Sequence, residues 1–208
     1  MKLCMFHPVG HPLERGWVGR IDGDRVIQLA AQTLQSFFTG GGSAREHAEY
    51  PRDEVVLLSP VLHPPSVRIF DTQESFAFAN PAAIVGPGAE IGHASRLSVR
   101  VRPAAVIGAE GAIGGFTILA EWRAEGLQPP KDRDFALGLG PVVVTPGAAP
   151  FDGGFDWRSA VAFAASGTTV FPGDVLAGPS REELDAAPGS SVAAEIEGIG
   201  VLEQRVAG

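Results

Sequence analysis

Glycine and proline break the apolar part of this chain into short runs. The 208 residues include 27 Gly and 17 Pro. The runs between them are rich in β-branched residues, as in AAVIGAEGAIGGFTIL, LGLGPVVVTP, TTVFPGDVLAG and SSVAAEIEGIGVLEQRV. Apolar runs bounded by turn-forming residues predict short strands. With 45% hydrophobic residues, the chain can also bury a core. We therefore expect an α+β fold that is mostly β.

The N-terminal part predicts a small α/β unit. Residues 17–29 read as a hairpin that turns at Asp22, Gly23 and Asp24, because these residue types tolerate tight turns. The apolar residues from Ile27 to Phe38 have roughly helical spacing, and three glycines follow them. The polar stretch SAREHAEYPRDE reads as a surface linker. The predicted domains are residues 1–54 and 55–208.

One further helix is predicted in the C-terminal part. Asp156 is a good N-cap for the segment WRSAVAFAA, whose expected apolar face carries Val161, Phe163 and Ala164.

Charge and composition narrow the classes of partner. The net charge is −8 and the basic residues are scattered, which argues against binding to nucleic acid. No run approaches the roughly 20 apolar residues of a membrane span, and the N-terminus lacks the apolar segment of a signal peptide. The single cysteine, Cys4, allows neither an intramolecular disulfide nor a cysteine-based metal site. We expect a cytoplasmic protein whose partner is a small neutral or anionic molecule.

The segment RLSVRVRPAAVIG holds two closely spaced arginines. In a strand, Arg100 and Arg102 face one way while Val99 and Val101 face the other. Two adjacent guanidinium groups repel each other unless an anion lies nearby. This strand therefore predicts an anionic partner for the arginines, either within the chain or as a ligand.

Seven segments in order resemble the fumarylacetoacetate hydrolase family, which includes hydrolases, decarboxylases, isomerases and tautomerases of 2-oxo and 1,3-dioxo acids. They are PPSVRIF, FANPAAIVGPG, AAVIGAEG, GGFTILAEW, KDRDFALGLGPVVVTP, FPGDVLAG and PGSSVAAEIEGIG, and they cover most of the chain from about residue 64 to residue 201. The resemblance implies a β-sandwich roll of short mixed strands, with the small N-terminal unit in front of it. It also implies a homodimer.

Members of that family hold a divalent cation, usually magnesium, with carboxylates that include an E-x-E pair on one strand. In this sequence the positions of that pair are Arg100 and Arg102. A third metal ligand, an Asp in the family, is matched by Glu121. The other family positions are matched by Ile69 (an Asp), Phe76 (the catalytic His), Pro179 (a Thr) and Lys131, which is kept as Lys. The resemblance therefore predicts that the magnesium site is lost and that no other cofactor is bound.

Two functional hypotheses follow from these replacements. In the first, which we favour, an arginine pairs with Glu121 and the protein is a non-catalytic scaffold or subunit, as a homodimer or as a heteromer with an active homologue. In the second, Arg100, Arg102 and Lys131 bind an anionic substrate. Glu121, Glu125 and Lys131 are then the candidate catalytic residues of a metal-independent isomerase, decarboxylase, C–C lyase or cyclase of a 2-oxo or 1,3-dioxo carboxylate.

Two further readings stay open. The protein could bind a small molecule without turning it over. Alternatively, the E-x-E strand is misaligned and a carboxylate such as Glu90 or Glu110 still holds a cation.

Overall fold

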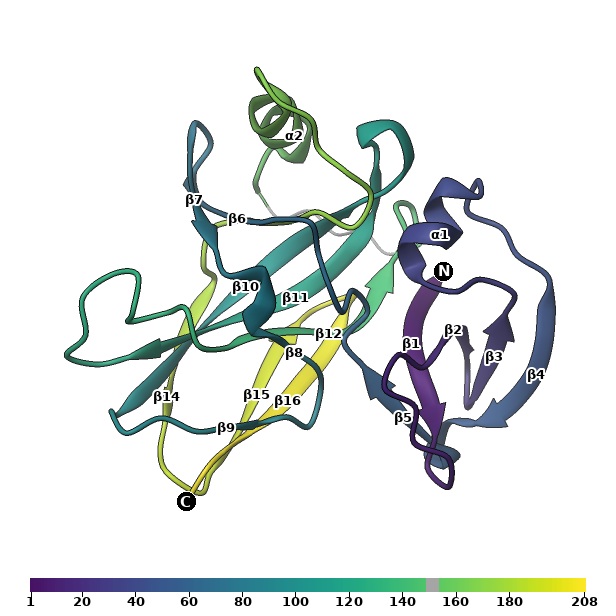
Figure 1. Ribbon diagram of the computed structural model, residues 1–208, viewed down its shortest axis with the longest axis horizontal. Coiled ribbons are helices and arrows are strands. Elements are labelled where there is room, and N and C mark those ends of the chain that lie inside the picture. Colours follow the sequence, from purple (N-terminus) through teal and green to yellow (C-terminus); the bar gives the residue numbers. More distant parts are fainter. Residues whose placement is uncertain (149–153) are drawn as a thin grey trace.

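The computed structural model describes residues 1–148 and 154–208, and most of its regular structure is strand (Figure 1). The strands are β1 Lys2–Pro8, β2 Trp17–Asp22, β3 Arg25–Leu29, β4 Glu46–Pro51, β5 Val55–Leu58, β6 Val67–Thr72, β7 Ser75–Ala79, β8 Ile84–Val85, β9 Glu90–Ile91, β10 Leu97–Ile107, β11 Ile113–Ala124, β12 Leu137–Val144, β13 Val175–Ala177, β14 Glu182–Ala186, β15 Ser191–Ile196 and β16 Gly200–Val206. The α-helices are α1 Leu34–Thr39 and α2 Trp157–Ala165. In the described part of the chain, neither helix has the length and apolar character of a membrane span. The α+β, mostly β class is confirmed.

One large mixed sheet contains strands from both predicted domains. Its order is β4-β3-β2-β1-β12-β11-β10-β13-β6-β7, and β14, β5 and β8 pair with β10, β1 and β12. β15, β16 and β9 form a second, small sheet. Because β1 pairs with both β12 and β5, the N-terminal strands continue the sheet of the C-terminal part. The division of the chain at residue 54 stays a prediction.

The N-terminal unit departs from the expected pattern in two places. The hairpin is confirmed as β2 and β3, but the predicted helix is too long, because Ile27 and Leu29 belong to β3. Helix α1 begins only after Thr33, whose hydroxyl accepts a hydrogen bond from the backbone N–H of Ser36. The predicted linker is also wrong, since Glu46–Pro51 forms the edge strand β4. Its polar residues suit an exposed edge, where charge discourages pairing with other chains.

The two sheets pack on each other through one face of the β10–β11 hairpin. Val99, Val101 and Trp122 meet Leu202 of the small sheet in one buried cluster. The indole Nε1 of Trp122 donates to Oε1 of the buried Gln204 at 2.7 Å, so the polar atom of this core residue is satisfied. The opposite face of β10 and β11 therefore carries the arginines, as the alternation predicts.

Helix α2 has the expected cap but a different buried face. Asp156 accepts hydrogen bonds from the backbone N–H and the hydroxyl of Ser159, at 3.1 and 2.6 Å. The buried residues are Trp157, Ala160 and Ala164, whereas Phe163 is 41% exposed. The expected apolar face was wrong at Phe163, because Trp157 sets the buried side and positions i+3 and i+7 follow it.

Burial makes the single thiol inert. Cys4 lies in β1 with no exposed surface, and this burial raises its pKa to about 12. Because the thiolate is the reactive form, we expect folded protein to react with a disulfide reagent such as dithionitrobenzoate only as fast as it unfolds. Urea-unfolded protein, which exposes the same thiol, is the control. Rapid stoichiometric labelling of the folded protein would contradict this prediction.

Candidate functional site

The β10–β11 hairpin places an arginine against a glutamate in the interior. The register pairs Arg100 with Glu121 and Arg102 with Leu119, so Arg100, Arg102 and Glu121 share one face. Arg102 reaches diagonally across the pair, and its Nε donates to Oε2 of Glu121 at 2.7 Å. The side chains of Arg102 and Glu121 are 1% and 0% exposed. A charge buried this deeply requires such a partner.

Both terminal nitrogens of the Arg102 guanidinium also have acceptors. One terminal nitrogen donates to the carbonyl oxygens of Phe70 at 3.4 Å and Gly178 at 3.1 Å. The other donates to Oδ1 of Asp71 at 2.9 Å. These acceptors come from β6 and from the residue after β13. In the sheet, β13 pairs with β10, and β6 pairs with β13. Arg102 thus holds two carboxylates and two carbonyls around one buried positive charge.

A second set of charges surrounds the other oxygen of Glu121. Oε1 lies 3.5 Å from a guanidinium nitrogen of both Arg123 and Arg133. Both arginines also contact Asp132, at 2.6 Å from Arg123 and 3.1 Å from Arg133. Burial raises the pKa of Asp132, but the hydrogen bond from Arg133 and the charges of Arg133 and Arg123 outweigh it, so the pKa is lowered. We call Asp71, Arg102, Glu121, Arg123, Asp132 and Arg133 the ion network.

Arg100 lies beside the ion network but pairs elsewhere. Its Nε donates to Oε2 of Glu183 at 3.0 Å, because β14 places Glu183 opposite Arg100 in the register. Ser98 donates to the other oxygen of Glu183 at 3.1 Å. The hydrogen bond from Arg100 is the main reason that the pKa of Glu183 lies below its ordinary value; burial opposes it, and Ser98 adds to it.

This pair predicts a small pH-dependent contribution to stability. A lowered pKa in the folded state stabilises the protein above the ordinary value of 4.5, and the contribution is lost as the pH falls through the lower folded value. Since the pair is partly exposed, we expect Glu183→Gln to cost at most about 1 kcal/mol at neutral pH. Urea unfolding of both proteins between pH 7 and pH 3 measures this. A gap that widens with acid would contradict it.

The structure unites only part of the predicted site. Arg102 and Glu121 form a direct pair. Lys131 is 75% exposed, and its Nζ contacts Asp134 at 2.7 Å. Glu125 is exposed too, and its nearest cationic partner is Arg96 at 3.7 Å. Lys131 and Glu125 therefore lie outside the ion network.

Four members of the ion network were not identified from the sequence. Arg123 follows Glu121 by two residues on β11, so strand alternation could have placed it on the same face. Asp71 follows Ile69, the position matched to a family ligand, by the same spacing. Asp132 and Arg133 come from the segment between β11 and β12, and no sequence periodicity indicated them.

Neither carboxylate of the misalignment hypothesis belongs to the ion network. Glu90 is exposed on β9, and Glu110 is exposed in a short turn with a φ of 53°. Within residues 1–148 and 154–208, no cluster of three or more His, Cys, Asp or Glu side chains has the arrangement of a metal site.

An open depression of about 380 Å³ borders the ion network. Its charged lining residues are Arg123 and the carboxylates Glu125, Asp132, Glu183 and Asp185. Acidic groups therefore dominate the space beside the network.

The fold matches those of solved oxo-acid enzymes, although the sequence matches no family model and no curated protein. Maleylpyruvate hydrolase from Sphingobium sp. SYK-6 is 18% identical, with a TM-score of 0.80 over 100% of this chain and 99% of that chain. A 2-hydroxyhepta-2,4-diene-1,7-dioate isomerase from Mycobacterium marinum is 20% identical, with a TM-score of 0.77 over 100% and 98%. A 2-keto-3-deoxy-D-arabinonate dehydratase, solved with magnesium and 2,5-dioxopentanoate, is 16% identical, with a TM-score of 0.79 over 100% and 99%. The chain thus has the fold of the fumarylacetoacetate hydrolase family, as the resemblance predicts.

Proposed function

We propose that this protein is a metal-free, non-catalytic relative of the enzymes that share its fold, with a role as a scaffold or subunit. The observation that carries the proposal is the buried pair of Arg102 and Glu121. The guanidinium of Arg102 gathers Glu121, Asp71 and two carbonyls, which are oxygen groups of the kind that hard divalent cations prefer. The positive charge of Arg102 thus neutralises and holds together these oxygen groups, as a bound divalent cation would.

The residues present do not fit a divalent cation. The two positions of the E-x-E pair carry arginines, and at the third ligand position both oxygens of Glu121 face guanidinium groups. A cation would have to displace Arg102 and would leave that charge buried without its partner, at a cost of several kcal/mol. The maleylpyruvate hydrolase has been solved with manganese and pyruvate. In this chain, the buried Arg102 disfavours an equivalent binding of a metal ion and an oxo acid.

The geometry supports the catalytic alternative less well. All three guanidinium nitrogens of Arg102 donate to internal acceptors, Arg100 pairs with Glu183 through its Nε, and Lys131 lies outside the ion network. Glu121 is buried among three guanidinium groups, so a substrate cannot reach it and it cannot act as a general base. Most of the charged residues that line the neighbouring depression are carboxylates, which repel an anionic oxo acid. A scaffold or subunit role, as a homodimer or as a heteromer with an active homologue, requires none of these groups to be free.

Metal content and turnover test the proposal together. Protein purified without chelators is analysed for divalent cations and then incubated with oxaloacetate and acetylpyruvate, with and without added manganese. We expect less than one cation per ten chains and no conversion above the buffer rate. One cation per chain would overturn the metal-free assignment. Conversion of either compound that is abolished by Arg102→Gln would overturn the non-catalytic assignment. Arg45→Gln, which changes an exposed arginine, is the control.

A further inference from the structure

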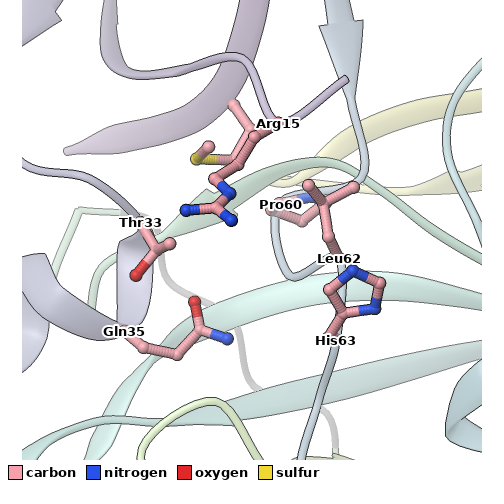
Figure 2. A pocket seen from close by; sticks show the side chains of 7 residues that line it. Arg15, Thr33, Gln35, Pro60, Leu62 and His63 are labelled. Carbon is pink, nitrogen blue, oxygen red and sulfur yellow. The ribbon is translucent and has the colours of Figure 1, made fainter. Parts of the chain in front are cut away.

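A second pocket lies away from the ion network, and nothing so far assigns it a function. It has a volume of about 300 Å³. It forms where the connection between β1 and β2, the start of α1 and the segment before β6 meet. Figure 2 shows the guanidinium of Arg15 and the amide of Gln35 pointing into the same space, with Leu62 and His63 on its other side.

This pocket and the ion network occupy opposite ends of the same two strands. β6 and β13 run parallel, and their starting ends are joined by a hydrogen bond of 2.8 Å from Ser66 to Asp174. The pocket residue His63 precedes that end. Arg102 contacts Asp71 and Gly178 at the other end. A ligand in the pocket is therefore distinct from anything bound beside the ion network.

Two glycines next to pocket residues are closely packed. Gly16, which follows Arg15, has a φ of +65°, and a Cβ there would lie 2.6 Å from the carbonyl oxygen of Phe6. Gly173 has a φ of +91°, and a Cβ there would lie 2.5 Å from Cγ of Gln35. Only glycine permits these conformations with so close an approach. The backbone next to Arg15 is thus sterically constrained, and the side chain of Gln35 packs against Gly173, while Arg15 itself is exposed.

The pocket lining is positively charged, although the chain as a whole is negative. The protein carries a net charge of −8, yet the lining contains Arg15 and no carboxylate within the described residues. In this same part of the chain, Arg15 forms no ion pair, whereas Arg100, Arg102, Arg123 and Arg133 each have a carboxylate partner. A guanidinium that faces a pocket with all its donors available is suited to bind a carboxylate through two hydrogen bonds.

The remaining lining residues suit an acid with an apolar body. The amide of Gln35 donates N–H groups, and the imidazole of His63 carries an N–H in either neutral tautomer. Met5, Pro60 and Leu62 supply the apolar surface. A few convergent polar groups on an apolar wall are typical of small-molecule sites, and a volume of about 300 Å³ is at the lower end of their range.

We infer that this pocket binds a small monocarboxylic acid. The carboxylate lies on Arg15, with Gln35 and His63 as further donors, and the hydrocarbon part packs on Met5 and Leu62. The single guanidinium matches one negative charge, and the apolar wall disfavours inorganic phosphate, which is hydrated on every side. The site binds the acid without transforming it.

Titration with hexanoate, followed by calorimetry and by amide NMR shifts, tests the inference. We expect saturable binding with shifts at residues 13–16, 33–36 and 60–64, and at least tenfold weaker binding of uncharged hexanamide. Arg15→Met should weaken hexanoate binding at least tenfold, since a charged hydrogen-bonded pair is lost. Arg45→Met, which removes an exposed arginine outside the pocket, should leave binding unchanged.

Several outcomes would overturn the inference. These are an absence of saturable binding, equal affinity for hexanamide, equal effects of both arginine variants, or shifts confined to the ion network. If Arg15→Met unfolds the chain, Gln35→Leu replaces it as the test, with at least a threefold loss of affinity expected. The readout needs neither metal nor turnover, so its failure is distinguishable from failure of the proposed non-catalytic role.

Discussion

Glu121→Gln lowers the free energy of unfolding by about 3 kcal/mol or more, because it leaves the buried Arg102 without its closest counter-ion. The two side chains are 0% and 1% exposed and 2.7 Å apart, so water cannot replace the lost charge. Asp71 contacts the same guanidinium, but it is 70% exposed and compensates only in part. Urea unfolding at neutral pH measures the change.

Two further variants distinguish the effect of breaking the buried pair from the general effect on stability of removing a carboxylate. Glu125→Gln removes an exposed carboxylate whose nearest cationic partner is 3.7 Å away, and should change stability by no more than about 0.5 kcal/mol. Arg102→Met combined with Glu121→Leu removes both buried charges and should recover most of the loss, because an apolar pair avoids desolvation. A double variant less stable than Glu121→Gln would contradict this account.

The features that were predictable from the sequence are those set by strand geometry. Alternation along β10 places Val99 in the core and Arg102 on the opposite face, and the short runs between glycines and prolines mark most strands. The pairing of an arginine with Glu121 is predictable too, because β10 and β11 are neighbours in sequence and in the sheet.

The features that were missed depend on contacts between distant segments. Asp71, Asp132 and Gly178 reach the ion network from β6, from the segment before β12 and from the residue after β13. The partner of Arg100 is Glu183, more than eighty residues away, and it lies on a short polar strand. Asp132 and Gly178 lie outside the strands, where no periodicity applies. For Asp71 and Glu183, alternation gives the face of the strand but not the distant strand that it meets.

The N-terminal error has a comparable cause. Apolar residues at Ile27, Leu29 and Leu34 fit a helical spacing, but the first two fit the alternation of a strand equally well. The pairing of β3 with β2 and β4 decides between them, because neighbours on both sides give the backbone groups of this segment hydrogen-bond partners.

Arg100→Glu combined with Arg102→Glu makes the stability of this protein depend on a divalent cation. Without metal, the variant places two new carboxylates on the face that already holds Glu121 and Asp71, with Glu183 beside them. Like charges this close repel strongly, so we expect a loss larger than that of Glu121→Gln. Manganese neutralises the repulsion and binds only the folded state, so the stability should rise with its concentration, by about 2.7 kcal/mol at a hundredfold excess over its Kd.

Arg100→Gln combined with Arg102→Gln is the matched control, because it removes the same two cations without adding carboxylates. It should be destabilised without responding to manganese, and the natural protein should not respond either. Urea unfolding of all three proteins, with manganese or with a chelator, provides the comparison. A manganese response confined to the glutamate variant means that this fold retains the oxygen groups that bind a cation. It also means that the Arg102 guanidinium occupies the position of that cation in the natural protein. A response of the natural protein, or none from the glutamate variant, would refute the substitution of guanidinium for metal.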